Sequence, residues 1–226
     1  LVKKIESEFD YIVFQDDVGF DIGSYMKFLE NSNSEYILPM SSSSYFNYSF
    51  SLNKLIETVE QKDCVIASSN CVYTSYKKSI LLTRKVFYKC GFFYALKYIF
   101  ACLRLYIYGF EFPKYPNPHI RTTGFICKTS FLKEFFNKHK FPSSKKECHK
   151  IESGYDSIYN FALNYGDICL TTASMKTNQV CEWIKISPFC KGIKEALIVD
   201  NRLLKMFEKS RKNIEYKKLL IWQNFI

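Results

Sequence analysis

Two adjacent carboxylates, Asp16 and Asp17, follow a hydrophobic run at residues 11–14. Four apolar β-forming residues in a row predict a strand buried on both faces. We therefore expect the two carboxylates at the carboxyl edge of a sheet, where open α/β folds bind ligands. They repel each other unless a cation such as Mg2+ or Mn2+, which also bridges to substrate phosphates, offsets their charge. An Asp that caps the following helix would explain the same pattern.

A second polar feature contains His119 and Arg121, two positions apart at the start of a predicted strand. Side chains at this spacing share one face of a strand. An imidazole and a guanidinium on one face suit a phosphate or a sugar hydroxyl. A purely structural His–Arg pair is the alternative interpretation.

A third feature is Glu152, which lies just before a predicted helix start near Gly154. A loop carboxylate at this place could act as a general base. Ser153 or Asp156 could cap the helix, and capping alone would explain much of the pattern.

The elements that must position these residues alternate between strands and helices, which predicts an α/β layered single domain. Helices are expected over residues 21–30, 130–138 and from 154 through 165, with a charged helical tail over 191–218. Residues 139–150 read as a polar loop, and residues 112–118 as a Pro-rich connection. Besides residues 11–14, the expected strands are residues 36–40, 65–67, 120–128 and 168–172.

The most apolar segment, residues 79–110, is interrupted by Lys85, Lys89, Lys97 and Arg104. No uncharged run of about 18 residues remains, so a transmembrane helix is not predicted. The segment instead predicts an amphipathic helix with a basic side and a Phe/Tyr/Leu side. It would pack against the core or lie on an anionic membrane surface.

Composition sets the outer limits of the interpretation. The chain has 226 residues, of which 47% are hydrophobic and 24% charged, and this excludes long-range disorder. Its 32 basic and 22 acidic residues give a net charge of +10, which suits nucleic acid, a membrane surface or a phosphorylated substrate.

The 9 cysteines show no CxxC spacing, so we expect free thiols in a reducing compartment, the cytoplasm. The chain begins at Leu1 and carries no signal-peptide pattern, as a truncated chain or excised domain would.

Together these segments resemble glycosyltransferases of the GT-A fold, in which a strand ends in an acidic DxD-type motif like residues 14–17 here. Residues 116–122, residues 152–157 and the stretch from Trp183 through residues 197–201 resemble one group of bacterial glycosyltransferase-like proteins associated with surface polysaccharides. The resemblance covers nearly the whole chain from residue 10 to about residue 205. Gln15 departs from it, because many relatives carry Asp or Glu there.

The resemblance implies a GT-A-like mixed sheet flanked by helices, lacking its N-terminal nucleotide-binding part. It implies sugar transfer from a nucleotide-sugar donor to a hydroxyl of a glycan or lipid-linked acceptor, with inversion by analogy. The implied sites are Asp17 for a divalent metal (Mg2+ or Mn2+), Glu152 for the base with Asp156 as the second choice, and Asp16, His119, Arg121 and Trp183 for substrate. A peripheral contact with the inner face of the cell membrane is a further expectation.

Two other functions stay open at this point. A catalytically inactive relative with a scaffold role fits Gln15 and the missing N-terminal part. A basic nucleic-acid-binding module fits the charge and the interleaved aromatic residues. The scattered lysines and the lack of an RRM, KH or zinc signature weigh against nucleic acid as the partner.

Overall fold

The computed structural model describes residues 19–73, 75, 96, 99–100, 103, 109–114, 116–186, 192–201 and 204. The predicted strand at residues 11–14, the carboxylates Asp16 and Asp17 and most of residues 79–110 lie outside this part of the chain. Among the described helices, none is both long and apolar enough to cross a membrane.

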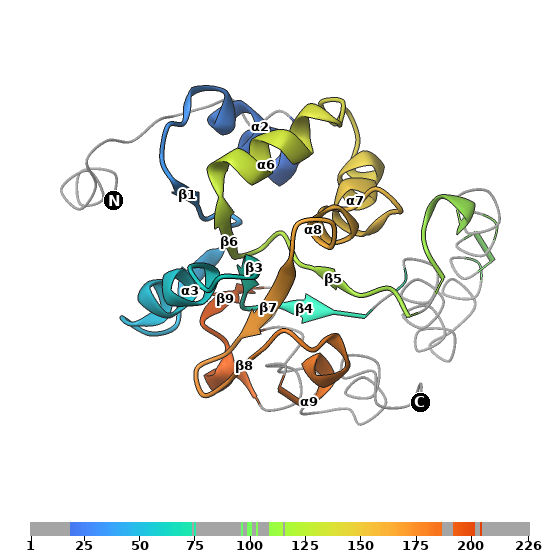
Figure 1. Cartoon of the computed structure of the whole chain (residues 1–226). Coiled ribbons are helices and arrows are strands. Elements are labelled where there is room, and N and C mark those ends of the chain that lie inside the picture. Colours follow the sequence, from blue (N-terminus) through green and yellow to red (C-terminus); the bar gives the residue numbers. More distant parts are fainter. Residues whose placement is uncertain are drawn as a thin grey trace.

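The centre of the fold is a five-stranded mixed sheet with the strand order β1-β6-β3-β7-β8 (Figure 1). Strands β3 and β7 run parallel, and the other neighbouring pairs run antiparallel. The strands are β1 (Tyr36–Ile37), β3 (Cys64–Ser68), β6 (Phe125–Lys128), β7 (Asp167–Thr171) and β8 (Lys176–Thr177).

Two short antiparallel pairs extend this framework. Strand β2 (Ser44–Phe46) pairs with β9 (Ile198–Asp200), and β4 (Cys71–Val72) pairs with β5 (His119–Ile120). Because β4 follows β3 after only two residues, the β4–β5 pair continues from the carboxyl end of a central strand. This pair carries one of the predicted site residues, His119.

Helices cover both faces of the sheet (Figure 1). One face packs against α2 (Phe20–Asn31), α6 (Thr129–Asn137), α7 (Lys145–Ser153), α8 (Ile158–Ala162) and α9 (Trp183–Ile186), whose buried residues form one cluster with the sheet. The other face packs against α3 (Ser51–Val59) and β9. Short 3-10 turns occupy Gly109–Glu111, Val180–Glu182 and Ile193–Glu195.

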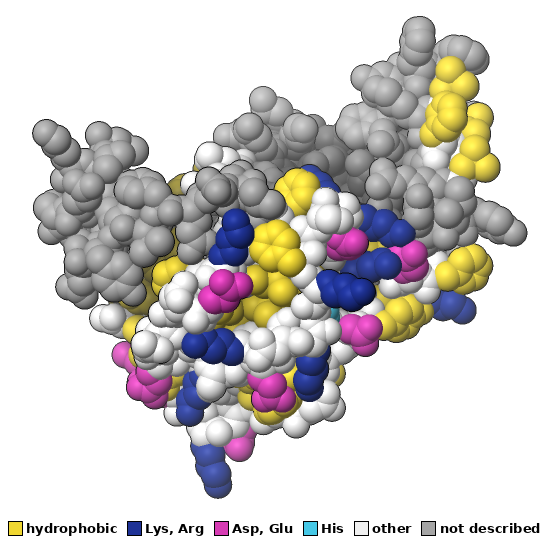
Figure 2. Space-filling model, turned by 90° about the horizontal axis from the view of Figure 1, so that it is seen from above, with side chains coloured by type: hydrophobic (Ala, Val, Ile, Leu, Met, Phe, Trp, Pro, Cys, Tyr) yellow, Lys and Arg dark blue, Asp and Glu magenta, His cyan; other side chains and the backbone are white. Residues whose placement is uncertain are grey.

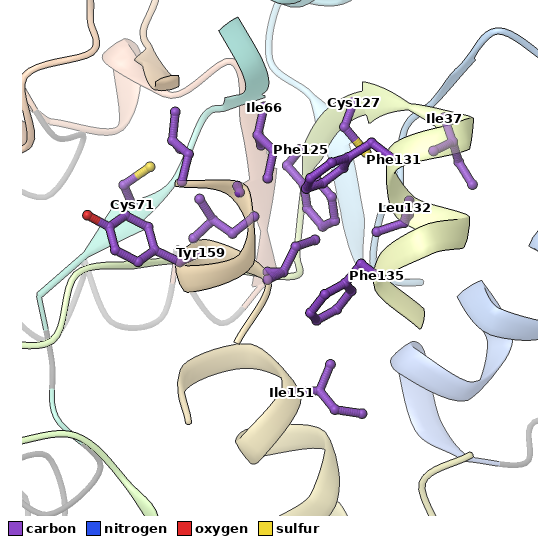
Figure 3. Close-up of a cluster of buried hydrophobic side chains, with 14 of the residues drawn as sticks. Ile37, Ile66, Cys71, Phe125, Cys127, Phe131, Leu132, Phe135, Ile151 and Tyr159 are labelled. Carbon is purple, nitrogen blue, oxygen red and sulfur yellow. The ribbon is translucent and has the colours of Figure 1, made fainter. Parts of the chain in front are cut away.

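Strand β6 shows how the sequence divides the two cores. Successive side chains of a strand point to opposite faces. Phe125 and Cys127 accordingly join the larger cluster, and Ile126 joins the cluster beneath α3. Figure 3 shows Phe125 and Cys127 beside Phe131 and Leu132 of α6. All of these side chains are buried, as both faces of a sandwiched sheet require.

The structure confirms the mixed α/β architecture and most of the predicted elements it describes. The helix predicted over 21–30 is α2, and the helix predicted over 130–138 is α6. The strands predicted at 65–67 and 168–172 are β3 and β7. In these segments the pattern of apolar residues is clearest, because the apolar residues are either consecutive or at helical spacing.

Three predictions about elements were wrong. Residues 139–150 are not all loop, because α7 begins at Lys145 behind a capping box made by Ser144 and Glu147. The strand predicted over 120–128 is broken by a turn between β5 and β6. The predicted tail helix contains strand β9 at Ile198–Asp200, and residues 205–218 lie outside the described residues.

Candidate functional site

The candidate site lies beyond the carboxyl end of β3, where the segment around β5 meets α7. The backbone N–H of Arg121 donates to the carbonyl of Asn70, two residues after β3 ends, over 3.0 Å. This bond fixes the residues after β5 beside the carboxyl end of β3, and open α/β folds bind ligands at such an edge. The Thr122 backbone then reaches the side chain of Glu152 on α7.

Glu152 is held at both carboxylate oxygens. Its Oε1 accepts hydrogen bonds from the backbone N–H of Thr122 at 3.1 Å and from the Thr122 hydroxyl at 3.3 Å. Its Oε2 lies 3.7 Å from Nδ1 of His149, one helical turn earlier on α7. The Glu152 side chain is 21% exposed, so one side of this carboxylate still faces solvent.

The surroundings of Glu152 keep it ionised. Burial raises its pKa, but the His149 imidazole 3.7 Å away, the charges of His119 and Arg121 and the Thr122 N–H together outweigh burial and bring the pKa to about 2. A carboxylate with this pKa carries its negative charge throughout the physiological range. It can therefore orient an imidazole or accept a hydrogen bond from a substrate hydroxyl.

His119 lies behind Glu152 in the protein interior. Burial lowers its pKa, while the charge of Glu152 acts in the opposite direction. Its Nδ1 lies 2.8 Å from the carbonyl oxygen of Asn117. Since a carbonyl only accepts, Nδ1 carries the hydrogen, and in the neutral form of the ring Nε2 is left as an acceptor.

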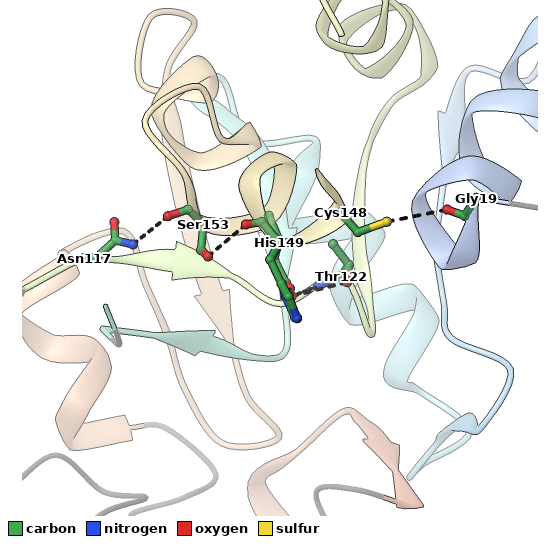
Figure 4. Close-up of polar contacts among 7 residues, drawn as sticks. Gly19, Asn117, Thr122, Cys148, His149 and Ser153 are labelled. Atoms are coloured by element: carbon green, nitrogen blue, oxygen red, sulfur yellow. Dashed lines mark hydrogen bonds and ion pairs between the residues drawn. The ribbon is translucent and has the colours of Figure 1, made fainter. Parts of the chain in front are cut away.

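A hydrogen bond from Asn117 fastens the end of α7 onto this segment, and one from Ser153 closes the last turn of the helix (Figure 4). The Asn117 amide donates to the carbonyl of Ser153 over 2.8 Å, and the Ser153 hydroxyl donates to the carbonyl of His149 over 3.0 Å. At the other end of α7 the capping box fixes the first turn. A short helix held at both ends sets the direction of Glu152 closely.

His149 is the site residue that sequence reasoning missed. It lies three positions before Glu152, and residues at this spacing are neighbours on a helix. Its side chain is 38% exposed, so it stands at the solvent side of the carboxylate. The signal was the Ser-x-x-Glu pattern at Ser144 and Glu147, which starts a helix and so places the imidazole and the carboxylate on one face.

Asp156, the second choice for the base, lies elsewhere. It lines a pocket of about 370 Å³ together with Glu111, Lys150 and Tyr155, and Glu152 does not line this pocket. The contact at Asp156 is made by its backbone carbonyl, which lies 2.9 Å from Nε2 of His139. The structure therefore separates the two carboxylates that the sequence pattern grouped together.

Trp183 is a core residue. Its side chain is fully buried and lies edge-on to Tyr73 at 6.0 Å and to Tyr159 at 5.9 Å between ring centroids. Contact between Trp183 and a substrate would require this core to open, so the placement gives the predicted substrate-binding role no support.

Asp16 and Asp17, on which the predicted metal and diphosphate site rests, lie outside the described residues. Within the part of the chain that is described, no three His, Cys, Asp or Glu side chains gather as a metal would need. Six cysteines are described, and all are free thiols, as predicted: Cys64, Cys71, Cys127, Cys148, Cys169 and Cys181.

Comparisons with models of protein families, with curated proteins and with solved structures find no match to this chain. The function must therefore be inferred from the chemistry of Glu152, His149, His119 and Arg121.

Proposed function

We propose that this protein is a GT-A-like glycosyltransferase that moves a sugar from a nucleotide-sugar donor to a hydroxyl of a glycan or lipid-linked acceptor. The observation that carries the proposal is the Glu152–His149 pair at the carboxyl end of β3, with Arg121 beside it. An ionised carboxylate and an imidazole at a solvent-facing sheet edge supply a proton acceptor. A nearby guanidinium supplies the positive charge that a departing diphosphate needs.

The proposed reaction is a direct displacement. The Glu152–His149 pair takes the proton of the acceptor hydroxyl as its oxygen attacks the anomeric carbon of the donor sugar. The bond between that carbon and the diphosphate oxygen breaks, and its electron pair leaves with the nucleoside diphosphate. Attack opposite the leaving group inverts the configuration at the anomeric carbon.

The roles of the two members of the pair follow from their exposure. His149 is the more exposed and takes the proton, whereas Glu152 orients it and stabilises the positive charge that the imidazole gains. Glu152 is thus a positioning residue in this proposal, because a carboxylate with a pKa of about 2 is a weak base. Thr122 in turn fixes the carboxylate through Oε1.

A divalent cation belongs to the proposal through Asp17 and Asp16. Carboxylate oxygens of this kind suit Mg2+ or Mn2+, which when bound would neutralise charge on the leaving diphosphate. Among the described residues, Arg121 supports the same step.

The test is release of nucleoside diphosphate by the full chain, measured with a panel of uridine, guanosine and thymidine diphosphate sugars and Mg2+ or Mn2+. We expect Glu152→Gln and His149→Gln each to lower turnover by about 100-fold or more. Glu57→Gln makes the same isosteric change on the exposed surface of α3 and is the matched control. Full turnover in both site variants, or no binding of any donor, would overturn the proposal.

A scaffold role is the second candidate, and one observation favours it. Both donors to Glu152 Oε1 come from Thr122, so the contact also works as a simple link between α7 and the segment after β5. A pure scaffold would bind no nucleotide sugar in an NMR titration, yet Glu152→Gln would still lower its stability. Donor binding by the unmodified chain would exclude this candidate.

A further inference from the structure

A row of apolar side chains on one helical face is exposed on this protein. Leu96, Ile99, Phe100 and Leu103 are helical, and their spacing of three, four and seven positions places them on a single face. Their exposed fractions run from 38% to 68%, and Phe110 is 81% exposed. We call the four helical residues the apolar stripe.

Isolated apolar residues on a surface need no explanation, but a contiguous row marks a binding surface. Hydrophobic side chains gather at the upper right of the face drawn in Figure 2, apart from its centre, where basic and acidic side chains lie among one another. That mixture of charges in the central face is unlike the continuous basic track that nucleic acid requires. The exposed apolar residues and the net positive charge therefore indicate a partner other than nucleic acid.

The charge of the surrounding sequence identifies the partner. No Asp or Glu occurs between Asp63 and Glu111. The same stretch contains seven basic residues: Lys77, Lys78, Arg84, Lys85, Lys89, Lys97 and Arg104. A stretch that combines exposed apolar residues with basic residues and no acidic ones complements an anionic lipid surface. A protein partner would need apolar complementarity alone, which leaves the one-sided charge unexplained.

The end of this stretch is attached to helix α7. Glu111 Oε2 forms ion pairs of 2.8 Å with Lys146 and with Lys150, both on α7. Phe112 is buried, so the chain enters the core directly after the exposed Phe110. Helix α7 also carries Glu152. A partner surface that binds the apolar stripe therefore lies on the side of the molecule to which α7 is tied.

We propose that the apolar stripe binds the surface of an anionic lipid bilayer, lying in the headgroup region with its apolar side chains directed into the lipid. The contact is peripheral: the stripe lies along the membrane plane. This inference goes beyond the proposed function and stands apart from it, because binding to vesicles is measured without donor, acceptor or turnover.

The experiment is vesicle flotation of the full chain with two compositions, pure phosphatidylcholine and phosphatidylcholine with 30% phosphatidylglycerol, about a third of the lipid being anionic. We expect binding to the anionic vesicles to exceed binding to the neutral ones by about fivefold or more, and to weaken as salt is raised. Leu103→Asp removes an apolar anchor and adds a repelled charge, so it should reduce the partition coefficient by about tenfold or more.

Leu163→Asp is the matched control, because the exposed fraction of Leu163 (53%) is close to that of Leu103 (55%). Leu163 lies directly after α8, away from the apolar stripe. This variant should bind vesicles as the unmodified chain does. Equal loss in both variants, or equal binding to neutral and anionic vesicles, would overturn the proposal. So would a dimer that Leu103→Asp dissociates without any vesicle binding, or a preference for single-stranded RNA over anionic vesicles in competition.

Discussion

The ionised state of Glu152 predicts a specific dependence of stability on pH. Its pKa of about 2 in the folded protein compares with an ordinary value of 4.5. Ionisation of this group therefore stabilises the fold at pH values above about 4.5. The difference corresponds to at most about 3 kcal/mol, an upper value because 21% of the side chain is exposed and water screens part of the interaction. This contribution disappears as pH falls from about 4.5 towards about 2.

Glu152→Gln removes this ionisation while keeping an oxygen that can accept from Thr122. The unmodified chain should therefore be more stable than the variant by up to about 3 kcal/mol at pH 7. The two-state linkage relation predicts that about 1 kcal/mol of that advantage is lost by pH 4 and about 2 kcal/mol by pH 3. His119 stays in both proteins, so its own protonation contributes to both curves.

The measurement is urea unfolding at pH 7, 5, 4 and 3, followed by circular dichroism and by the fluorescence of the buried Trp183. Glu57→Gln makes the same change on the exposed face of α3, away from the site, and is the control. A gap between Glu152→Gln and the unmodified chain that stays constant from pH 7 to pH 3 would refute the reasoning, because the loss would then not come from ionisation.

Two further predictions concern the sheet and the thiols. Gly166 has a φ of +154°, and a Cβ there would lie 2.5 Å from the carbonyl oxygen of Asp63. Gly166→Ala should therefore destabilise the fold by about 2 kcal/mol in thermal unfolding. An unchanged melting temperature would contradict the strained geometry. Burial raises the pKa of the Cys71 and Cys127 thiols, whereas Cys181 is exposed. Among the six described thiols, iodoacetamide at pH 7.5 should therefore modify Cys181 first. Rapid modification of Cys127 in the folded chain, read by mass spectrometry, would show that this core is open.

Local patterns in the sequence were sufficient for the elements whose apolar residues are closely spaced. Helix α6 buries Phe131, Leu132, Phe135 and Phe136, which recur at helical spacing. Strand β3 contains Val65 and Ile66, which prefer strands, and its last three residues are buried. In such segments one face or both faces must be buried, so the type of element follows from the sequence itself.

Helix α7 could not be recognised from apolar spacing, because only Ile151 and Ser153 of its nine residues are buried. Its helical state rests on the capping box of Ser144 and Glu147 and on the contacts that hold its end. The break between β5 and β6 was likewise hidden in the sequence. At Gly124 a Cβ would lie 2.6 Å from Ile198, a residue far along the chain, and only the folded structure shows that approach.

The sequence by itself determined the chemistry available at the candidate site, because the types of Glu152, His119 and Arg121 are fixed by the chain. Only the tertiary structure decided how these residues combine. It brought Thr122 to Glu152 across 30 positions, separated Asp156 from them and added His149 to the site. The physical reason is that a pKa and a hydrogen bond depend on distance and burial, which the packing of α7 against the end of β5 sets.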